Sequence, residues 1–396
     1  MKVLVANIGS TSFKYRLFEM PGELLLARGG VERIGSESAR CFVQAGGHQD
    51  ESIAPIPDHA AAVRLCLEQL SHPDAGCLKS PAELAAIGFK AVHAKNLTGV
   101  HRVTPEVLTA MEEFSEICPA HNPPYVRAMR LLSEQLPEIP LVAAFETGFH
   151  ATIPLEHRLY AVPREWQRDH GIQRWGFHGA SHRYISERVQ QVIQPRPSRV
   201  ISCHLGGSSS LCAIRDGRSE ANSLGMSPQS GLPQNNRVGD FDVFALGYLL
   251  RTTGKSLPEL LETLANRSGL AGLSQAGNDL RDIEAAAANG NEDAQVAINV
   301  YVASVRHYLG AYLLQLGGAD AIVFTGGIGE NSSLIREAVC RDLEWFGIAL
   351  DPERNRAAQG EVPVHAHTSR LQIWTMPTNE EIVVARLSVQ HLLSPN

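Results

Sequence analysis

The hydrophobic and polar positions of the chain alternate between short apolar runs and amphipathic stretches. Residues 2–6 form an apolar run, a turn rich in Gly, Ser and Thr follows, and a second apolar run covers 13–18. Two such runs joined by a turn are typical of a β-hairpin. The same pattern returns at 200–204 and 211–214, around a turn at 205–210. The pattern therefore predicts two similar hairpins far apart in the chain.

The two predicted hairpins are similar residue by residue. When residue 3 is aligned with residue 200, Gly9 meets Gly206 and Thr11 meets Ser208. A repeat at this distance indicates two duplicated domains, because the repeats of a solenoid are only about 20–50 residues long. We interpret the Pro-rich segment 195–198, just before the second copy, as a connector.

Other segments have the patterns of helices and of a buried strand. Apolar residues at helical spacing predict helices at 181–193 and 293–316. The apolar run 320–325 predicts a fully buried strand, which a glycine loop at 326–331 joins to a helix at about 333–342. Strands that alternate with helices in this way indicate an α/β fold class.

Composition narrows the class of protein. The chain has 396 residues, 44% of them hydrophobic, which allows two or three domains. Its net charge of −7 argues against nucleic acid as a partner, since nucleic-acid-binding surfaces are basic. The seven cysteines lack C-x-x-C spacing, which predicts reduced core thiols and a cytoplasmic location. The apolar runs are too short for a signal peptide or a membrane span, so we expect no membrane association.

The two hairpin turns are the first candidates for chemistry. Small residues let the backbone approach an anion closely, and consecutive N–H and hydroxyl groups can hold phosphates. A single Gly/Ser turn is more often only a hairpin turn, but two matching copies favour phosphate binding. Lys14 could add a positive charge near the first turn. The segment 254–256 resembles the end of a P-loop, but Leu249 stands where the first glycine should be, so we reject a Walker A motif.

Histidine, arginine and acidic residues give further candidates. His178 and His182 have the spacing of a zinc helix, but Gly179 occupies the place of the general-base Glu, which argues against a metalloprotease. His178 is instead expected at the start of a helix, where it could reach an oxyanion. Arg237 lies in a polar, Gly-containing loop, and phosphoryl transfer needs such a fixed cation. Glu380 opens the last predicted helix and could be either a dipole partner or a metal ligand.

Taken together, these motifs resemble the acetate kinase family. The similarity covers essentially the whole chain, with the motifs in the family's order. They lie at 7–14, 119–123, 145–150, 175–179, 204–206, 237–240, 326–331 and 377–381.

The resemblance implies a fold and a reaction. The fold is α/β, with duplicated actin-like (ribonuclease H-like) domains and a nucleotide cleft between them. The N-terminal domain would span 1–148, completed by a C-terminal helix at 380–396, and the second domain would span 149–379. The reaction is reversible transfer of the γ-phosphate of ATP to a short carboxylate, giving an acyl phosphate. Mg²⁺, with Mn²⁺ as an alternative, is the implied cofactor, and a homodimer the implied assembly.

The resemblance also implies roles for residues that match the family's motifs. His178 and Arg237 match transition-state stabilisers, and Glu146 stands where the family has a catalytic Asp. Asn7 and Glu380 match the magnesium site. The substrate-binding set is Lys90, Val92, His121, Phe177 and Pro228. The nucleotide-binding set is Lys14, His204, Gly206, Gly207, Ser208, Asp279, Arg281, Gly327, Ile328 and Asn331.

Several positions depart from the family's pattern. Lys90 replaces an Arg that grips the carboxylate, which exchanges a bidentate planar group for a point charge. Glu146 carries its carboxylate one methylene further than the usual Asp, and Ala120 stands where a pocket Leu is usual. We hypothesise that a Lys90–Glu146 pair compensates for the first two changes, while Lys95 could add a second positive group.

The leading prediction is therefore an ATP-dependent carboxylate kinase, with acetate or propionate as the default acceptor. One alternative is a kinase of the same fold that acts on a larger or more polar carboxylate, for which Lys90, Glu146 and Ala120 are the reason. Another alternative is an ATP-binding scaffold with little catalytic activity. The retained His178, Arg237, Asn7 and Glu380 argue against the scaffold, which has no chemical need for them.

Overall fold

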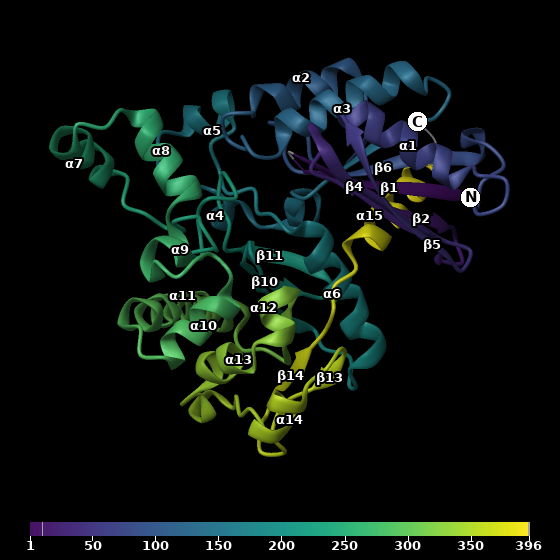
Figure 1. Ribbon diagram of the computed structural model, residues 1–396. Coiled ribbons are helices and arrows are strands. Elements are labelled where there is room, and N and C mark those ends of the chain that lie inside the picture. Colours follow the sequence, from purple (N-terminus) through teal and green to yellow (C-terminus); the bar gives the residue numbers. More distant parts are fainter. Residues whose placement is uncertain (10, 395–396) are drawn as a thin grey trace. The chain divides into compact units, whose positions relative to one another are not determined.

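The computed structural model describes residues 1–9 and 11–394, so Ser10 of the first predicted turn lies outside the described residues. The chain divides into two compact units (Figure 1). Unit 1 contains Met1–Gly148 and the residues from Asn379 onward, and unit 2 contains Phe149–Thr378. Each unit is built around one β-sheet, as the α/β pattern predicts.

Unit 1 has an eight-stranded sheet in the order β5-β4-β3-β2-β1-β6-β8-β7. The predicted first hairpin is present, with β1 and β2 antiparallel and Asn7 opposite Lys14. β6 and β8 continue the sheet in parallel with β1. The strands are β1 Lys2–Ile8, β2 Ser12–Glu19, β3 Leu24–Glu32, β4 Ser36–Ala45, β5 His48–Ile56, β6 Leu84–Ala91, β7 Val100–Arg102 and β8 Leu141–Phe145.

Helices cover this sheet and complete its core. α1 (His59–Leu70) and α3 (Asn122–Gln135) bury apolar side chains together with alternate residues of β1, such as Leu4. α2 (Pro105–Glu113) packs beside α3. The C-terminal helix α15 (Glu380–Leu393) packs on β1 and β6.

α15 can approach β6 closely because Gly88 has no side chain. A Cβ atom at Gly88 would lie only 2.5 Å from Ser388 Oγ and 3.0 Å from Val384 Cγ1. A larger residue would therefore push α15 away from the sheet. Gly88 therefore permits the close packing of α15 on β6, and in this packing Glu380, the first residue of the helix, lies beside the end of β6.

Unit 2 repeats the architecture of unit 1 with a six-stranded sheet in the order β11-β10-β9-β12-β14-β13. In both sheets the first three strands are antiparallel neighbours. A later strand, β6 in unit 1 and β12 in unit 2, pairs in parallel with the first strand on its other side. An antiparallel edge strand follows in each unit. The strands are β9 Arg199–His204, β10 Ser210–Arg215, β11 Arg218–Asn222, β12 Ala321–Thr325, β13 Val362–Pro363 and β14 Gln372–Thr375. The duplication read from two turns is confirmed by this shared strand order.

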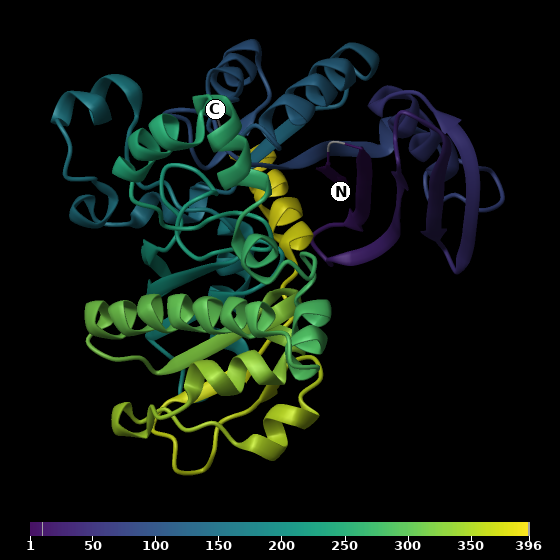
Figure 2. The ribbon, with the colours of Figure 1, turned by 60° about the vertical axis from the view of Figure 1, so that its left-hand side comes forward.

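The sheet of unit 2 lies between two helices. α6 (Gly179–Val192) shares a buried cluster with Val200 and Val323, whereas α11 (Glu292–Leu316) shares another with the alternate residues Ile201 and Phe324. Figure 2 shows α11, in light green, as one long helix. The remaining helices are α4 Leu155–Arg158, α5 Arg164–His170, α7 Phe244–Thr253, α8 Leu257–Asn266, α9 Gly269–Ser274, α10 Leu280–Ala288, α12 Gly326–Asn331, α13 Ser333–Cys340 and α14 Pro352–Ala357. Short 3-10 turns occupy Pro81–Glu83, Gly148–Thr152 and Glu344–Phe346.

Two local predictions were wrong. The segment 195–198 does not connect the two units, since it joins α6 to β9 inside unit 2. The predicted glycine loop is the short helix α12, because the N–H groups of Ile328 and Gly329 both donate to the Leu205 carbonyl and coil the backbone there.

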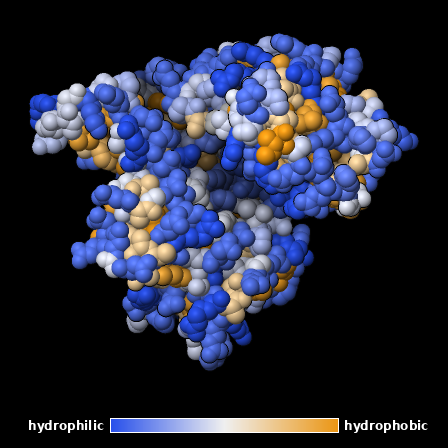
Figure 3. Space-filling model, viewed as in Figure 1, coloured by the Kyte–Doolittle hydropathy of each residue, from blue (hydrophilic) through white to orange (hydrophobic). Residues whose placement is uncertain are grey.

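The exterior carries mostly polar side chains in the view of Figure 3, interrupted by separate hydrophobic patches. Among the described residues no helix combines the length and the apolar character needed to span a membrane. All seven cysteines are free thiols, and each is buried except Cys77, which is partly exposed. The predicted reduced core thiols are therefore present.

Candidate active site

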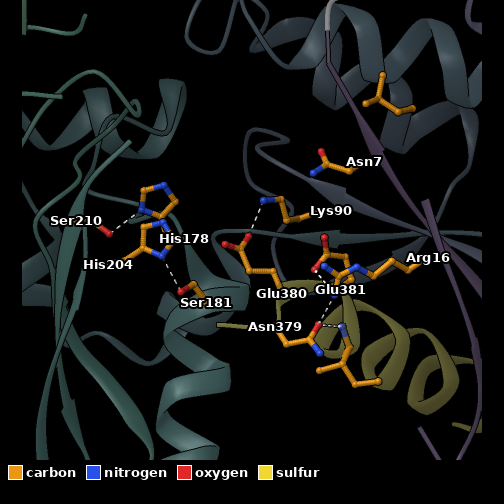
Figure 4. Close-up of polar contacts among 12 residues, drawn as sticks. Asn7, Arg16, Lys90, His178, Ser181, His204, Ser210, Asn379, Glu380 and Glu381 are labelled. Atoms are coloured by element: carbon orange, nitrogen blue, oxygen red, sulfur yellow. Dashed lines mark hydrogen bonds and ion pairs between the residues drawn. The ribbon is translucent and has the colours of Figure 1, made fainter. Parts of the chain in front are cut away.

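In unit 1, charged side chains from distant parts of the chain meet where β6 ends. Lys90 is the penultimate residue of β6, and its Nζ lies 2.5 Å from Glu380 Oε2 at the start of α15 (Figure 4). Both side chains are partly buried. Burial favours the neutral amine, but the carboxylates of Glu380 and Glu146 outweigh it and raise the pKa of Lys90. Lys90 is therefore a permanently charged ammonium with two carboxylates around it.

The hypothesised Lys90–Glu146 pair stays a prediction, and Glu380 is a further partner of Lys90 that the sequence analysis did not name. The ion pair that the structure gives Lys90 is with Glu380, and Glu146 acts on it through its charge. Glu146 follows β8 and is 5% exposed. Both carboxylates therefore act on the Lys90 ammonium group.

Tyr125 on α3 connects this cluster to Asn7. Its hydroxyl donates to Asn7 Oδ1 and accepts from the Ile8 N–H, both at 3.2 Å. Burial raises the pKa of Tyr125, and the charges of Lys90, Glu146 and Glu380 all act on the same phenol. Asn7, Lys90, Glu146 and Glu380 are therefore brought together around one tyrosine, which the sequence analysis missed.

The oxygen atoms of this cluster suit a hard cation whose remaining ligands are water and phosphate oxygens. Mg²⁺ prefers oxygen ligands, and it is commonly held by one or two carboxylates together with water and phosphate oxygens. Asn7 supplies an amide oxygen and Glu380 a carboxylate. In the part of the chain that the structure describes, no group of three or more His, Cys, Asp and Glu could hold a metal by itself. The residues thus fit a magnesium ion carried by a phosphate, with Lys90 sharing the Glu380 carboxylate.

The other predicted residues of unit 1 have different surroundings. Lys14 lies on β2 and pairs with Glu32 of the neighbouring strand at 2.8 Å. Val92 is 8% exposed, directly after β6, while His121 precedes α3 and is partly exposed. Ala120, which was expected to enlarge a pocket, is exposed.

We expect Tyr125→Phe to weaken the function of this cluster. The substitution leaves the Ile8 N–H without its buried acceptor and Asn7 without its donor, so we expect a loss of about 1–3 kcal/mol of unfolding free energy. Asn7 also loses its orientation, so the divalent metal concentration needed for half-maximal activity should rise. Urea unfolding and metal titration measure both effects. Tyr15→Phe is the matched control, because the buried Tyr15 hydroxyl bonds no residue within 1–9 and 11–394; equal effects of the two substitutions would contradict the proposed role.

In unit 2, His178 lies at the start of α6, as predicted. Its backbone has φ of +57°, a left-handed conformation that is costly for a residue with a side chain and that concentrates at functional sites. Its ring stacks on the His204 ring, with centroids 4.3 Å apart. His178 Nδ1 hydrogen-bonds Ser210 Oγ at 2.8 Å, and His204 Nδ1 hydrogen-bonds Ser181 Oγ at 2.8 Å (Figure 4). The two imidazoles are therefore held in fixed planes.

The second glycine turn and α12 form one backbone surface. Ser209 Oγ accepts from the Gly206 N–H and donates to the Gly206 carbonyl, which closes the turn. A Cβ atom at Gly326 would lie 2.7 Å from the Leu205 carbonyl, so only glycine permits this contact. The predicted nucleotide residues Gly206, Gly207, Gly327, Ile328 and Asn331 all lie on these two segments.

Arg336 anchors α12 from inside the protein. It is 1% exposed, and its guanidinium donates to the carbonyls of Gly329 and Glu330 and to the side chain and carbonyl of Asn355. Burial lowers its pKa to about 10, so it remains charged at neutral pH.

We expect Arg336→Met to lower the unfolding free energy by about 3 kcal/mol, because four acceptors, three of them in buried hydrogen bonds, lose a charged donor. Loosening of α12 should also weaken nucleotide binding. Urea unfolding and nucleotide titration test this prediction. Arg341→Met, at an exposed position at the end of α13, is the control and should change neither quantity. An unfolding free energy for Arg336→Met within 0.5 kcal/mol of the unaltered protein would refute the anchoring role; that margin is roughly what a surface substitution costs.

Arg237 is held by a polar frame. Its Nη1 lies 3.2 Å from Gln234 Oε1 and 3.4 Å from the Pro228 carbonyl, and Ser208 Oγ is 3.5 Å away. Ser208 itself donates to Gln234 Oε1 at 2.6 Å. The structure thus brings together three residues that were predicted separately, Arg237, Ser208 and Pro228, and adds Gln234, which no motif indicated.

The remaining predicted residues of unit 2 divide into a buried and an exposed group. The Phe177 carbonyl accepts from Asn222 Nδ2 and hydrogen-bonds His150 Nε2, and its side chain is 2% exposed. Asp279 caps α10 and pairs with Arg281 at 2.5 Å, with the Arg281 side chain 88% exposed. The assignment of Asp279 and Arg281 to nucleotide binding stays a prediction.

Comparisons with known proteins place this chain in a family. A family model described as the acetokinase family matches residues 2–386. An acetate kinase of Shouchella clausii (strain KSM-K16) is 40% identical over 392 residues, 98% of this chain and 99% of the relative. The crystal structure of Porphyromonas gingivalis acetate kinase has a TM-score of 0.88 at 37% identity, covering 99% of both chains. A propionate kinase from Francisella tularensis subsp. tularensis SCHU S4 has a TM-score of 0.89 at 30% identity, covering 98% of both chains. With its duplicated α/β architecture and these matches, the chain belongs to the acetokinase family and is a phosphotransferase that uses a carboxyl group as acceptor.

Proposed function

We propose that the protein transfers the γ-phosphate of ATP reversibly to a short carboxylate, with acetate or propionate as the default acceptor, and forms an acyl phosphate. The observation that supports this most is the cluster in unit 1, where Asn7, Lys90, Glu146 and Glu380 gather around Tyr125. A cation for a carboxylate and oxygen ligands for a metal-bound phosphate are the groups that this reaction needs.

Each residue has a stated task in this proposal. Lys90 binds the acceptor carboxylate, and His178 and Arg237 donate to the equatorial oxygens of the phosphoryl group. Glu146 takes the place of the family's catalytic Asp beside the reacting groups. The turn at Gly206–Ser208 and α12 offer N–H groups to the nucleotide. Direct phosphoryl transfer needs little covalent help, so positioning and charge stabilisation supply most of the rate.

Magnesium, with manganese as an alternative, is the proposed cofactor, held by Asn7 and Glu380 together with phosphate oxygens. When bound, it neutralises developing charge on the phosphates. Glu380, which would hold the metal, is the ion-pair partner of Lys90. Lys90 would then keep ammonium charge available for the acceptor carboxylate.

A larger or more polar acceptor is the second candidate, favoured by Lys90 itself. An ammonium group accepts a carboxylate from many directions, whereas a guanidinium imposes bidentate planar geometry. Trapping of the acyl phosphate with hydroxylamine, over acetate, propionate, butyrate and hydroxy acids, ranks the acceptors. A marked preference for acetate would reject the second candidate. Absence of acyl phosphate with every acid, while ATP still binds, would favour the scaffold alternative.

We also propose a cytoplasmic homodimer. Apolar side chains of the segment 241–261 are exposed, with Phe244 at 87% and Tyr248 at 60% exposure. A second copy of the chain would remove them from water, as obligate interfaces do. The molar mass in solution, measured by light scattering, tests the assembly.

A further inference from the structure

A chain of hydrogen bonds runs from His178 into the interior of unit 2. His178 Nδ1 and His182 Nε2 both hydrogen-bond the Ser210 hydroxyl, each at 2.8 Å. His182 Nδ1 in turn hydrogen-bonds the Ser202 hydroxyl at 2.9 Å. Ser202, His182 and Ser210 are fully buried. We call Ser202–His182–Ser210–His178 the serine–histidine chain.

The hydrogen bonds of the serine–histidine chain can all run in one direction or all in the other. Each hydroxyl has one proton, and a neutral imidazole donates from one nitrogen and accepts at the other. In the outward order, Ser202 donates to His182, His182 donates to Ser210, and Ser210 donates to His178 Nδ1. In the inward order every donation is reversed, and His178 Nδ1 carries the proton.

Ser202, at the buried end of the serine–histidine chain, determines which of the two orders is favoured. Among residues 1–9 and 11–394, the Ser202 hydroxyl has one hydrogen-bond partner, His182 Nδ1. In the inward order Ser202 would accept from His182, and its own buried proton would have no acceptor. A buried donor without an acceptor loses its hydrogen bond to water and gains none in the protein, which disfavours the inward order. In the outward order that proton is used.

The electrostatic surroundings of His182 keep it neutral, as the chain requires. Burial lowers the pKa of His182 well below its ordinary value, and the nearby His150 and His204 lower it further. Burial also lowers the pKa of His150 to about 4, so His150 adds no charge at neutral pH. His182 thus acts as a single donor and a single acceptor.

The geometry points to His182 and Ser210 as positioning residues that fix the tautomer of His178, with its proton on Nε2, the ring nitrogen away from Ser210. This inference rests on the proposed role of His178 as a donor to the phosphoryl oxygens. A neutral His178 can fill that role only through Nε2–H, because Nδ1 is occupied by Ser210. The same reasoning applies to His204, whose Nδ1 faces the Ser181 hydroxyl at 2.8 Å.

The first measurement reads the tautomer directly, without turnover. Protein labelled with ¹⁵N-histidine is studied by long-range ¹H–¹⁵N NMR at about pH 8, above the ordinary histidine pKa of about 6.5. His178→Gln identifies the His178 signals by their loss. We expect the unaltered protein to have protonated Nε2 and unprotonated Nδ1 at His178. Protonated Nδ1 would overturn the inference and the donor task of His178, whereas the kinase function itself is tested separately by acyl phosphate formation.

Three substitutions link the tautomer to catalysis. Ser210→Ala removes the centre of the chain, so the His178 signals should become those of mixed tautomers, and kcat should fall roughly tenfold to a hundredfold, with a smaller change in KM. His182→Gln keeps an N–H donor for Ser210, and kcat should stay within about threefold of the unaltered protein if the outward order holds. Ser219→Ala is the matched control, since this buried serine hydrogen-bonds His150 at 2.8 Å outside the chain, and it should leave both readouts unchanged.

The outcomes separate this inference from the proposed function. Mixed tautomers in Ser210→Ala with full kcat would refute the positioning role. A His182→Gln variant that is folded but as slow as Ser210→Ala would refute the outward order. Failure of the proposed function would appear differently, as absence of acyl phosphate formation by the unaltered protein.

Discussion

Arg237→Ala is expected to lower kcat by about a thousandfold or more while leaving ATP affinity within a few-fold. Phosphoryl transfer depends on a fixed cation at the equatorial oxygens, and removal of such an arginine typically costs about 10³–10⁵ in rate. Gln234, Pro228 and Ser208 hold the guanidinium in place, so its contribution is pre-organised. Single-turnover kinetics and nucleotide titration separate the two quantities.

Two further variants sharpen the Arg237 prediction. Arg237→Lys keeps the charge but loses the planar donor set, so it should recover only part of the rate. Arg168→Ala, at an exposed position on α5, should behave like the unaltered protein. Turnover by Arg237→Ala within tenfold of the unaltered protein would remove Arg237 from the transition-state assignment.

Lys90→Met should have the second largest effect, on the acceptor rather than on the nucleotide. The substitution leaves the carboxylates of Glu146 and Glu380 without their shared cation, so an incoming carboxylate meets negative charge where it met positive charge. We expect kcat/KM for the acceptor to fall by about a hundredfold or more, equivalent to about 2.7 kcal/mol. Steady-state kinetics with varied acceptor at saturating ATP measures this change.

The control for Lys90 is Lys2→Met, which removes a partly buried lysine paired with Glu83 at 2.5 Å in the same unit. It should change kcat/KM for the acceptor by less than about threefold. Lys90→Arg is the informative third variant, because it exchanges a point charge for a planar, bidentate donor. If Lys90 sets acceptor choice, Lys90→Arg should narrow the acceptor range toward the smallest acids; an unchanged acceptor ranking would show that Lys90 does not determine specificity.

The parts of the fold that local pattern determines were predictable. The two hairpins, the helix at α11 and the buried strand β12 follow from periodicity and turn residues within a few positions of each other. α12 was not predictable, because its coiling depends on the Leu205 carbonyl, more than 100 residues earlier in the chain. The connector at 195–198 was misread because prolines mark any loop, within a domain or between domains.

The candidate site likewise has a part that could be predicted from the sequence and a part that could not. Motifs identified the chemically distinctive residues, but not the partners that orient them. Lys90 and Glu380 are 290 positions apart, and only the packing of α15 on β6 brings them to 2.5 Å. Tyr125, Ser210 and Gln234 belong to residue types that occur in every protein, and only their hydrogen bonds in the folded chain distinguish them.

The packing of α15 against Gly88 has a consequence for how the protein matures during translation. Domains usually form in the order in which the ribosome makes them, the N-terminal one first. Here the helix that covers β1 and β6 is made after the whole of unit 2, so unit 1 stays unfinished until unit 2 has been synthesised. A nascent chain that stalls before residue 380 leaves an apolar sheet face bare and Lys90 without the carboxylate of Glu380. The second unit is therefore complete in sequence before the first one is.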